Sequence, residues 1–582
     1  MTTKYVRITG SNSNNGSTPS LAYLTVAYAV TTAAPAAGDI IYVGAGSYRA
    51  VLAPSHSGSQ LSTTYNGTNG SSLVTLGSVI TLTSVSGLVA PPAGYYNTGS
   101  VVTSSGVVGF TWTGISGSTL TGVTFLTNIT VASTATVASS ATLLANTAIW
   151  IIGDVDGSQT GDAGQVISTG YTTNDKTVPS STAQLVFSTN KHLAFALFTF
   201  ISGASGGMIT NAAGGIGYTF IDCTFNHLAS SSYTNGTMAF ISSTTGLAMF
   251  IMIDRCSVFH GINQNYGIQF TLTTTASGSA DWDALVLIRD TFDLAPVTYS
   301  GQIGVIAGGT AAHHGGGVRV SSSHLFSGQG GGFYAVTATY LSTTIPCEIH
   351  NSWGWTGGEY ALSAATSGQI VESYNWLWGG STATRLNVTA GTGSIADGSY
   401  APLVELGQSY KWAGVIRQFF APDAPSPLLG FGSDGNSPTV DWMNRPRPSG
   451  GGSSNNAAGF AEFHDFSVES TTTYPSGQTA SAEMTGPGDT DIWVPVDATA
   501  TVITLQLYQG AGYTGTNYAT ATLLAQNELG VSAQIETCSS TTGSWQTLTF
   551  GSFTPTKAGY VKIRVTSYDT SGTGTLFFGA LT

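Results

Sequence analysis

The middle of the chain repeats a short order of apolar and polar positions. Residues 221–225, 288–292 and 349–353 each run isoleucine, polar, small or polar, serine or threonine, aromatic, and residues 253–259 are a looser copy. The positions that open successive copies are 32, 35, 32, 29 and 22 residues apart: Ile221, Ile253, Ile288, Val320, Ile349 and Val371. One copy cannot bury its apolar face alone, so the copies must stack as coils. An ordinary sandwich, with strands about every 8 to 12 residues, does not predict such a repeat. The pattern therefore favours a parallel β-helix over residues 51–420.

The first fifty residues predict a cap and a first coil. Residues 21–30 form a short amphipathic segment, and a Gly-Asp turn at 38–39 leads into the apolar run 40–43 and a Gly-rich turn. The stretch GDIIYVGAGSYR at 38–49 resembles the opening of pectate-lyase-like right-handed parallel β-helix proteins of the bacteriophage tail spike or virion surface type. The resemblance implies the fold and not the chemistry.

The sequence pattern changes after a connector rich in Pro and Gly at residues 421–459. Short β-like runs then follow one another at sandwich spacing over residues 460–582. The run 545–550, with 553–559 after it, resembles jelly-roll modules that bind carbohydrate or cap fibrous proteins. The predicted fold class is therefore all-β: a right-handed parallel β-helix followed by a C-terminal antiparallel β-sandwich (jelly roll).

Charge is scarce along the whole chain. Charged residues make up 8% of it and the net charge is −13, while Gly contributes 75 residues and hydrophobic residues 41%. Nothing in this balance attracts nucleic acid or anionic lipid. Residues 21–30 lack the basic region that precedes a signal-peptide core, and no apolar run is long enough to span a bilayer. We therefore expect neither nucleic-acid binding nor membrane insertion.

The most distinctive local feature is a doubled aromatic motif. Trp353 and Trp355 are followed 23 residues later by Trp376 and Trp378, a separation of one short coil. Facing outward, these four rings and Tyr360 would form a platform for binding sugar rings. The hydrogen-bonding groups near them in the sequence are Glu359, Glu372 and Tyr374.

The alternative is that the tryptophans pack in the core or at an interface. Ile349, Trp353 and Trp355 share parity, so an uninterrupted strand would bury all three on one side. A turn at Asn351 would reset that count. Buried ladders are the commoner use of aromatics in repeats, which favours packing over the glycan platform.

Carboxylate pairs would be needed by a glycosidase, about 5 to 9.5 Å apart. The candidate pairs are Asp281 with Asp283, Asp290 with Asp293, and Glu359 with Glu372. A β-eliminating lyase would need a base beside calcium-binding carboxylates, and the repeats contain only isolated cations such as Arg255, Arg289 and Arg319. We therefore expect no catalytic residue.

Metal and cofactor sites are not predicted either. Residues 154–165 resemble a calcium loop, but Gln159 and Gln165 stand where Gly and Glu are required, so a surface turn is the better interpretation. The histidines and the four cysteines lack metal-ligand spacing, and the histidines are interpreted as loop or ladder residues. Cys223 and Cys256, 33 residues apart, are expected to be neighbouring free thiols in the stack.

These observations favour a structural or host-attachment protein of a virus particle, such as a phage tail spike, fibre or head-surface protein, located on a virion or an extracellular surface. The alternatives are a polysaccharide-degrading lyase or hydrolase on a β-helix scaffold, and a bacterial surface adhesin. The expected partners are host-surface polysaccharide, other virion proteins and further copies of the chain. The resemblance to phage spikes implies a homotrimer.

Overall fold

The computed structural model describes residues 1–49, 52–126 and 133–169 without a break, then strands and corners of the repeat up to residue 419, and most of residues 467–579. The longest segments outside the described residues are 170–184, 395–407 and 420–466, which include the predicted connector. The chain divides into two units, Met1–Glu462 and Phe463–Thr582.

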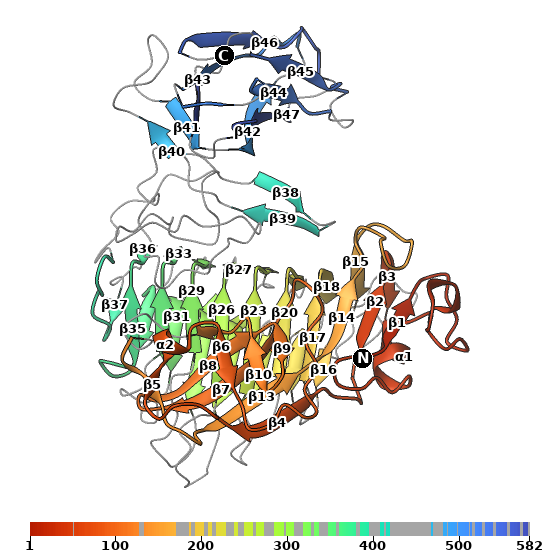
Figure 1. Cartoon of the computed structure of the whole chain (residues 1–582), viewed down its shortest axis with the longest axis vertical. Helices are drawn as coiled ribbons and strands as arrows, with labels where there is room; N and C mark the ends of the chain where they lie inside the picture. The colour runs from red at the N-terminus through yellow and green to blue at the C-terminus, as the bar shows by residue number, and fades with distance from the viewer. Residues whose placement is uncertain are drawn as a thin grey trace. The chain divides into compact units, whose positions relative to one another are not determined.

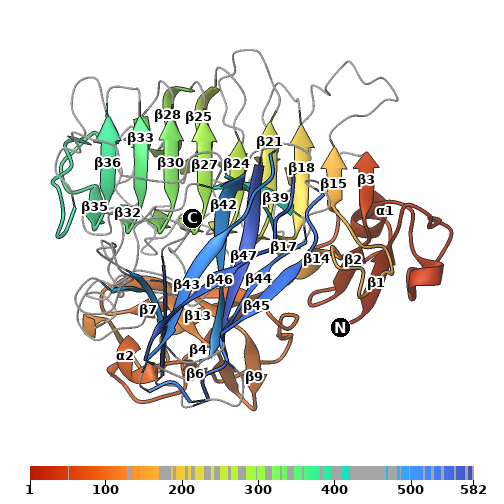
Figure 2. The ribbon, with the colours of Figure 1, turned by 90° about the horizontal axis from the view of Figure 1, so that it is seen from above.

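The first unit is built around three parallel sheets, which the coils cross in turn (Figures 1 and 2). Sheet A runs in the order β1 (Thr3–Val6), β2 (Ile40–Val43), β14 (Ile149–Gly153), β17 (His192–Ala196), β20 (Gly217–Ile221), β23 (Met249–Asp254), β26 (Ala284–Arg289), β29 (Val318–Ser321), β32 (Cys347–His350) and β35 (Ile370–Ser373). Sheet B runs β3 (Gly46–Arg49), β15 (Val166–Thr169), β18 (Phe198–Ser202), β21 (Thr224–His227), β24 (Ser257–Phe259), β27 (Phe292–Ala295), β30 (His324–Ser327), β33 (Trp353–Thr356) and β36 (Trp376–Gly379). Sheet C runs β16 (Leu185–Phe187), β19 (Ile209–Asn211), β22 (Met238–Ile241), β25 (Gln264–Leu272), β28 (Thr298–Ala307), β31 (Gly331–Val336), β34 (Leu362–Ala364) and β37 (Arg385–Leu386). Successive coils pair in parallel in all three sheets, so the predicted parallel β-helix is confirmed.

The core column of sheet A contains most of the predicted anchors. Four of them pair in register and are buried in the core: Ile253, Ile288, Val320 and Ile349. The predicted anchors at the two ends are wrong by one position. Phe220 pairs with Ile253 and Glu372 pairs with Ile349, so Ile221 and Val371 belong to the outer face. The last coil therefore places a carboxylate where the earlier coils have apolar side chains.

From β17 onward, the corner between sheets A and B has one residue per coil in the left-handed region. The φ angles there lie between 48° and 62°, at Leu197, Asp222, Arg255, Asp290, Ser322, Asn351 and Tyr374. Each backbone N–H donates to a carbonyl of the following turn of chain; that of Asp222 reaches the Asp254 oxygen at 3.1 Å. Non-glycine residues adopt this conformation at a cost, so the stack maintains it.

A ladder of small polar side chains follows this corner into the core. Its members are Cys223, Cys256, Thr291, Ser323, Ser352 and Asn375, all buried. The backbone N–H of Thr291 donates to the Ser323 hydroxyl at 3.3 Å, that of Ser323 to the Ser352 hydroxyl at 3.1 Å, and that of Ser352 to the Asn375 amide oxygen at 2.9 Å. Cys223 and Cys256 are free thiols on adjacent coils, as predicted.

Ser322 and Ser323 test the corner and the ladder separately. Ser322 is buried at φ 48°, and its hydroxyl has no hydrogen-bond partner among the described residues. We expect Ser322→Gly to raise the free energy of unfolding by about 1 kcal/mol, because glycine relieves the left-handed strain and removes an unpaired hydroxyl. Ser323→Ala should lower it by about 1 to 2 kcal/mol, because Thr291 loses its acceptor. The test is the urea concentration at the unfolding midpoint of each variant. Equal destabilisation by Ser322→Gly and Ser323→Ala would contradict this account.

Residues 59–147 interrupt the parallel repeat, and we call them the insert. Their main sheet runs β11 (Thr124–Leu126), β8 (Gly106–Trp112), β7 (Asn97–Thr103), β13 (Thr142–Thr147) and β4 (Ser59–Thr64). The smaller elements are β5 (Ser71–Ser72), α2 (Leu73–Leu76), β6 (Val79–Thr81), β9 (Gly114–Ser116), β10 (Thr119–Thr121) and β12 (Thr136–Val137). The prediction of parallel coils from residue 51 onward is wrong here, since pairing is antiparallel and a connection as short as 104–105 can join only antiparallel strands.

The insert has a core of its own and also packs on sheet A. Phe110, Trp112 and Leu143 belong to the insert core. A separate apolar cluster joins Tyr96 of the insert to outer-face residues of sheet A, among them Trp150. Figure 2 shows the insert strands along one side of the stack.

The start of the first coil is covered as predicted. Helix α1 (Val26–Thr31) follows the 3-10 turn η1 (Pro19–Leu21), and Val26, Ala29 and Val30 are part of the β-helix core. The Thr25 hydroxyl caps the helix by accepting the Tyr28 N–H at 3.2 Å. Among the described residues, no helix has the length and apolar character needed to cross a bilayer.

The second unit consists of two antiparallel sheets around one core. The first runs β40 (Ser467–Glu469), β41 (Ser481–Thr485), β48 (Thr575–Gly579), β43 (Thr504–Gln509) and β46 (Trp545–Thr549). The second runs β42 (Gly488–Val496), β47 (Gly559–Ser567), β44 (Thr520–Leu523) and β45 (Gln534–Thr537). Leu507 of the first sheet and Val561 of the second belong to the same core. The predicted sandwich is present, and its jelly-roll order stays a prediction. The first unit also includes a hairpin of β38 (Gln408–Trp412) and β39 (Val415–Phe419).

Candidate functional site

Sheet B aligns the tryptophans of the doubled motif. Trp353 pairs with Trp376 and Trp355 pairs with Trp378, so the 23-residue offset is one coil. Asn351 lies between β32 and β33 with φ 50°. The alternation between inner and outer faces that is counted from Ile349 therefore stops at Asn351. Asn351 is the turn after which the count begins again.

The core-facing positions of these two strands lie between the tryptophans. Gly354 pairs with Leu377, both are buried, and Leu377 belongs to the β-helix core. Successive positions along a strand belong to opposite faces. Positions 353, 355, 376 and 378 therefore lie on the outer face of sheet B.

Two outer columns of sheet B lead to these positions. One contains Asn226, Phe259, Leu294, Phe326, Trp355 and Trp378, and the other contains Thr224, Ser257, Phe292, His324, Trp353 and Trp376. Each column begins with a polar residue and ends with two tryptophans. We call the last three coils of these columns the aromatic strip. Of the members whose side chains are described, Asn226 and Phe259 are half-buried, whereas Thr224 and Ser257 are buried.

The other groups expected beside the tryptophans are placed differently. Tyr360 is half-buried just before β34, Tyr374 is half-buried at the left-handed corner, and Glu359 is outside the described residues. Glu372 faces the core and accepts hydrogen bonds from Arg385 Nε at 2.6 Å and Asn375 Nδ2 at 2.9 Å. The expectation that Glu372 could serve a ligand on the outer face is wrong.

Each candidate carboxylate pair has at least one side chain outside the described residues. Asp281 and Asp283 are outside the described residues, and Asp293 lies in β27. Asp290 is buried at the corner. In the calcium-like loop, Asp154 accepts the Thr160 N–H at 2.5 Å, as in a turn. Among the described residues, no three His, Cys, Asp or Glu side chains are grouped so as to hold a metal.

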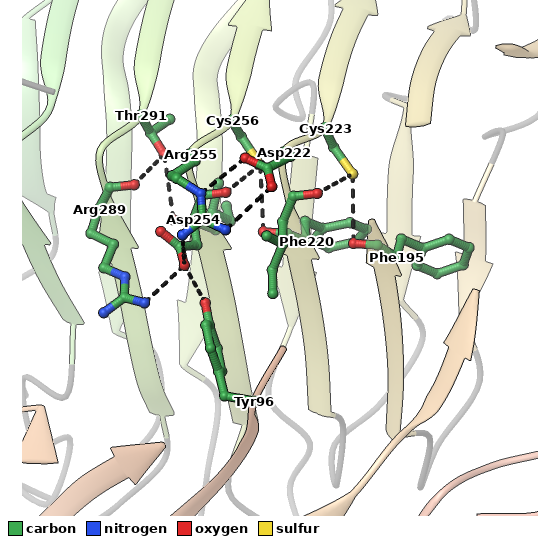
Figure 3. A network of polar contacts seen from close by, with 12 residues as sticks. Tyr96, Phe195, Phe220, Asp222, Cys223, Asp254, Arg255, Cys256, Arg289 and Thr291 are labelled. Atoms are coloured by element: carbon green, nitrogen blue, oxygen red, sulfur yellow. Dashed lines mark hydrogen bonds and ion pairs between the residues drawn. The ribbon is translucent and has the colours of Figure 1, made fainter. Parts of the chain in front are cut away.

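A buried charged network joins the insert to sheet A (Figure 3). Tyr96, just before β7, donates its hydroxyl to Asp254 Oδ2, to which Arg289 Nη2 also donates at 2.8 Å. Arg255 lies 3.4 Å from that oxygen and makes a two-pronged contact with Asp222, at 3.0 and 3.2 Å. The interpretation of Arg255 and Arg289 as isolated cations is therefore wrong.

The electrostatics of this network are those of a closed structural contact. Burial alone would raise the pKa of Asp254, but the charges of Arg289 and Arg255, with hydrogen bonds from Arg289 and Tyr96, lower it to about 2. Burial and the Asp254 charge raise the pKa of the Tyr96 hydroxyl well above its usual value, so Tyr96 remains a donor. We interpret the network as the polar contact that fixes the insert to sheet A.

Arg319 is also paired. Its Nη2 lies 2.5 Å from Glu348 Oε2, and His350 Nε2 lies 3.0 Å from the same oxygen. Glu348 lies one coil after Arg319, and His350 lies two residues after Glu348. All three residues are on the outer face of sheet A. Spacing in the sequence did not reveal this cluster because a loop of variable length separates the two strands.

Comparisons with known proteins return structures only. No family model matches the chain, and no curated protein matches it. The complex structure of XylC with xylose is 11% identical with a TM-score of 0.23, covering 79% of this chain and 98% of that one. The tailspike protein gp49 from Pseudomonas phage LKA1 is 13% identical with a TM-score of 0.22, covering 91% and 85%. Pantoea stewartii WceF, described as a glycan biofilm modifying enzyme with a bacteriophage tailspike-like parallel β-helix fold, is 8% identical with a TM-score of 0.16, covering 74% and 55%. With TM-scores this low, the fold assignment rests on the strand pairing itself.

Proposed function

We propose that this protein is a structural or host-attachment protein of a virus particle, and that it binds host-surface glycans along the aromatic strip. The observation that carries the proposal is the pairing of Trp353 with Trp376 and of Trp355 with Trp378 at outer positions of sheet B. Aromatic rings offer an apolar face to sugar rings and need no charge to do so.

The rest of the molecule supports a durable surface role. Charged residues make up only 8% of the chain, so its stability does not depend on many surface ion pairs. The stack is instead supported by strand pairing in three sheets and by the inward polar ladder from Cys223 to Asn375. The low content of charged residues also supports assembly into a homotrimer, which we include in the proposal.

The test uses the full chain on an array of purified bacterial surface polysaccharides. The double change Trp355→Ala, Trp378→Ala is expected to weaken the binding of the recognised glycan at least tenfold, since truncating tryptophan at the centre of an interface often costs about 2 kcal/mol or more. Tyr42→Ala is the matched control, because Tyr42 is a half-buried aromatic side chain on sheet A, where its ring stacks on that of Tyr5 with the ring centres 6.2 Å apart. It should leave binding unchanged.

Light scattering of the same variants separates the two interpretations of the tryptophans. A platform predicts weaker glycan binding at an unchanged molecular mass. Dissociation of the oligomer with unchanged glycan binding would assign the tryptophans to an interface between copies and contradict the platform. Detection of the protein in purified virions by mass spectrometry, with capsid and tail genes beside its own, is the expected result for a virion protein.

A further inference from the structure

Four polar side chains form a relay on the outer face of the last coils of sheet A. Arg319 pairs in register with Glu348, and His350 with Ser373. Glu348 and His350 are two residues apart on β32 and so share a face. Ser373 Oγ lies 2.7 Å from His350 Nδ1, and His350 Nε2 lies 3.0 Å from Glu348 Oε2, which Arg319 Nη2 contacts at 2.5 Å.

The contacts assign the proton on the imidazole. Burial alone would raise the pKa of Glu348, but the Arg319 charge and hydrogen bonds from His350 and Arg319 lower it to about 2, so the carboxylate is ionised at neutral pH. An ionised carboxylate can only accept, so the neutral imidazole carries its proton on Nε2. Nδ1 is left with a lone pair that accepts the Ser373 hydroxyl. This neutral tautomer is the form of the imidazole that acts as a general base.

We propose that Ser373, His350 and Glu348 form a hydrolytic triad that cleaves small acyl esters. Ser373 is the nucleophile, His350 is the base, and Glu348 orients the imidazole and stabilises its protonated form. Arg319 is a positioning residue that acts through Glu348. The site lies on sheet A, so it is separate from the aromatic strip on sheet B and does not depend on the glycan proposal.

Exposure of the relay indicates the class of substrate. The His350 side chain is 3% exposed, Ser373 is half-buried, and Val371 on the same face of β35 is 41% exposed. The base is thus shielded from water while the nucleophile lies at an open face. An open face admits an ester whose acyl group is small and whose alcohol is large, such as an acylated polymer.

The reaction balances with water as the only co-reactant. Ser373 Oγ forms a bond to the ester carbonyl carbon as its proton passes to His350 Nδ1. The bond between that carbon and the alcohol oxygen breaks, and His350 returns the proton to the departing alcohol, which leaves acyl-Ser373. Water then attacks the acyl carbon, gives a proton through His350 to Ser373 Oγ, and releases the carboxylic acid.

The test uses the full chain with p-nitrophenyl acetate as substrate and a fluorophosphonate as covalent probe. We expect hydrolysis above the buffer rate and a fluorophosphonate adduct that mass spectrometry locates on Ser373. Ser373→Ala and His350→Asn should each lower the rate at least a hundredfold, and the double change should lower it no further, because the residues act as a unit.

Ser321 provides the matched control. It occupies the same outer column one coil before His350, with which it pairs in register, and it is 5% exposed. Ser321→Ala should keep the wild-type rate and the adduct on Ser373. A wild-type protein that neither hydrolyses the ester nor takes up the probe would overturn the proposal, as would equal rates for wild type and Ser373→Ala. The adduct is measured on the wild-type chain, so a folding defect in a variant cannot account for its absence. A folding defect also cannot produce equal rates for wild type and Ser373→Ala.

Discussion

Replacing Asp254 by alanine should lower the free energy of unfolding of the first unit by about 3 to 5 kcal/mol, because it leaves buried arginines without their counter-charge. Asp254 is 0% exposed, and Arg289 and Arg255 both contact its Oδ2. Arg289 makes no other ion pair among the described residues, and its guanidinium lies 5.3 Å from the centre of the Tyr96 ring. The loss of one carboxylate therefore also removes the partner of the Tyr96 hydroxyl and loosens the insert.

Three measurements check this expectation. Asp156→Ala, in an exposed turn, is the matched control and should change stability by less than about 1 kcal/mol. In hydrogen exchange, the amides of β7 should lose protection in Asp254→Ala. Adding Arg289→Met should recover part of the stability, because the uncompensated charge is then gone. Full protection of the β7 amides from hydrogen exchange in Asp254→Ala would contradict the proposal that the network fixes the insert to sheet A.

The same carboxylate gives a pH dependence whose sign can be stated. The pKa of Asp254 is lowered in the folded chain to about 2, below its ordinary value of 3.8. Its contribution to stability is therefore present above about pH 4 and is lost as the pH falls toward 2. Asp254→Ala should be less stable at neutral pH and should lose less stability over that acid range.

The sequence predicted the parts of the fold that repeat and missed those that occur once. Ile253, Ile288, Val320 and Ile349 recur at coil spacing because each coil must bury an apolar residue on the one before it. The insert occurs once, and its Ser, Thr, Gly and Val content is the same β-forming composition as that of the coils. Only its short turns distinguish it, because they require antiparallel pairing.

The candidate sites divide in the same way. The 23-residue offset predicted the pairing of Trp353 with Trp376, because both positions follow the same corner in successive coils. It did not predict their face, which depends on the left-handed conformation of Asn351. The relay of Arg319, His350 and Ser373 draws on three coils, and the loops between them vary in length, so no fixed spacing marks it.

The last coil ends on a buried carboxylate. Glu372 pairs with Ile349 in the core column and is fully buried. Its Oε1 accepts from Arg385 Nε at 2.6 Å and the Gly391 N–H at 3.3 Å, and its Oε2 accepts from Asn375 Nδ2 at 2.9 Å. Among the described residues β35 is the last strand of sheet A, so the backbone beyond it is held by other acceptors. Glu372 supplies them, and it ties residues 385 and 391 across the end of the stack.

Glu372→Ala is accordingly expected to lower the free energy of unfolding by about 3 to 5 kcal/mol, because Arg385, with 6% of its side chain exposed, is left as an uncompensated buried charge. Val371→Ala, at an exposed position of the same strand, should change stability by about 0.5 kcal/mol or less. In hydrogen exchange, the amides of β35 and β36 should open before those of β20, because each coil is held mainly by its neighbours and fraying begins at the end that has lost its cap. Uniform loss of protection along the stack would show that Glu372 stabilises the unit as a whole and does not act as its end cap.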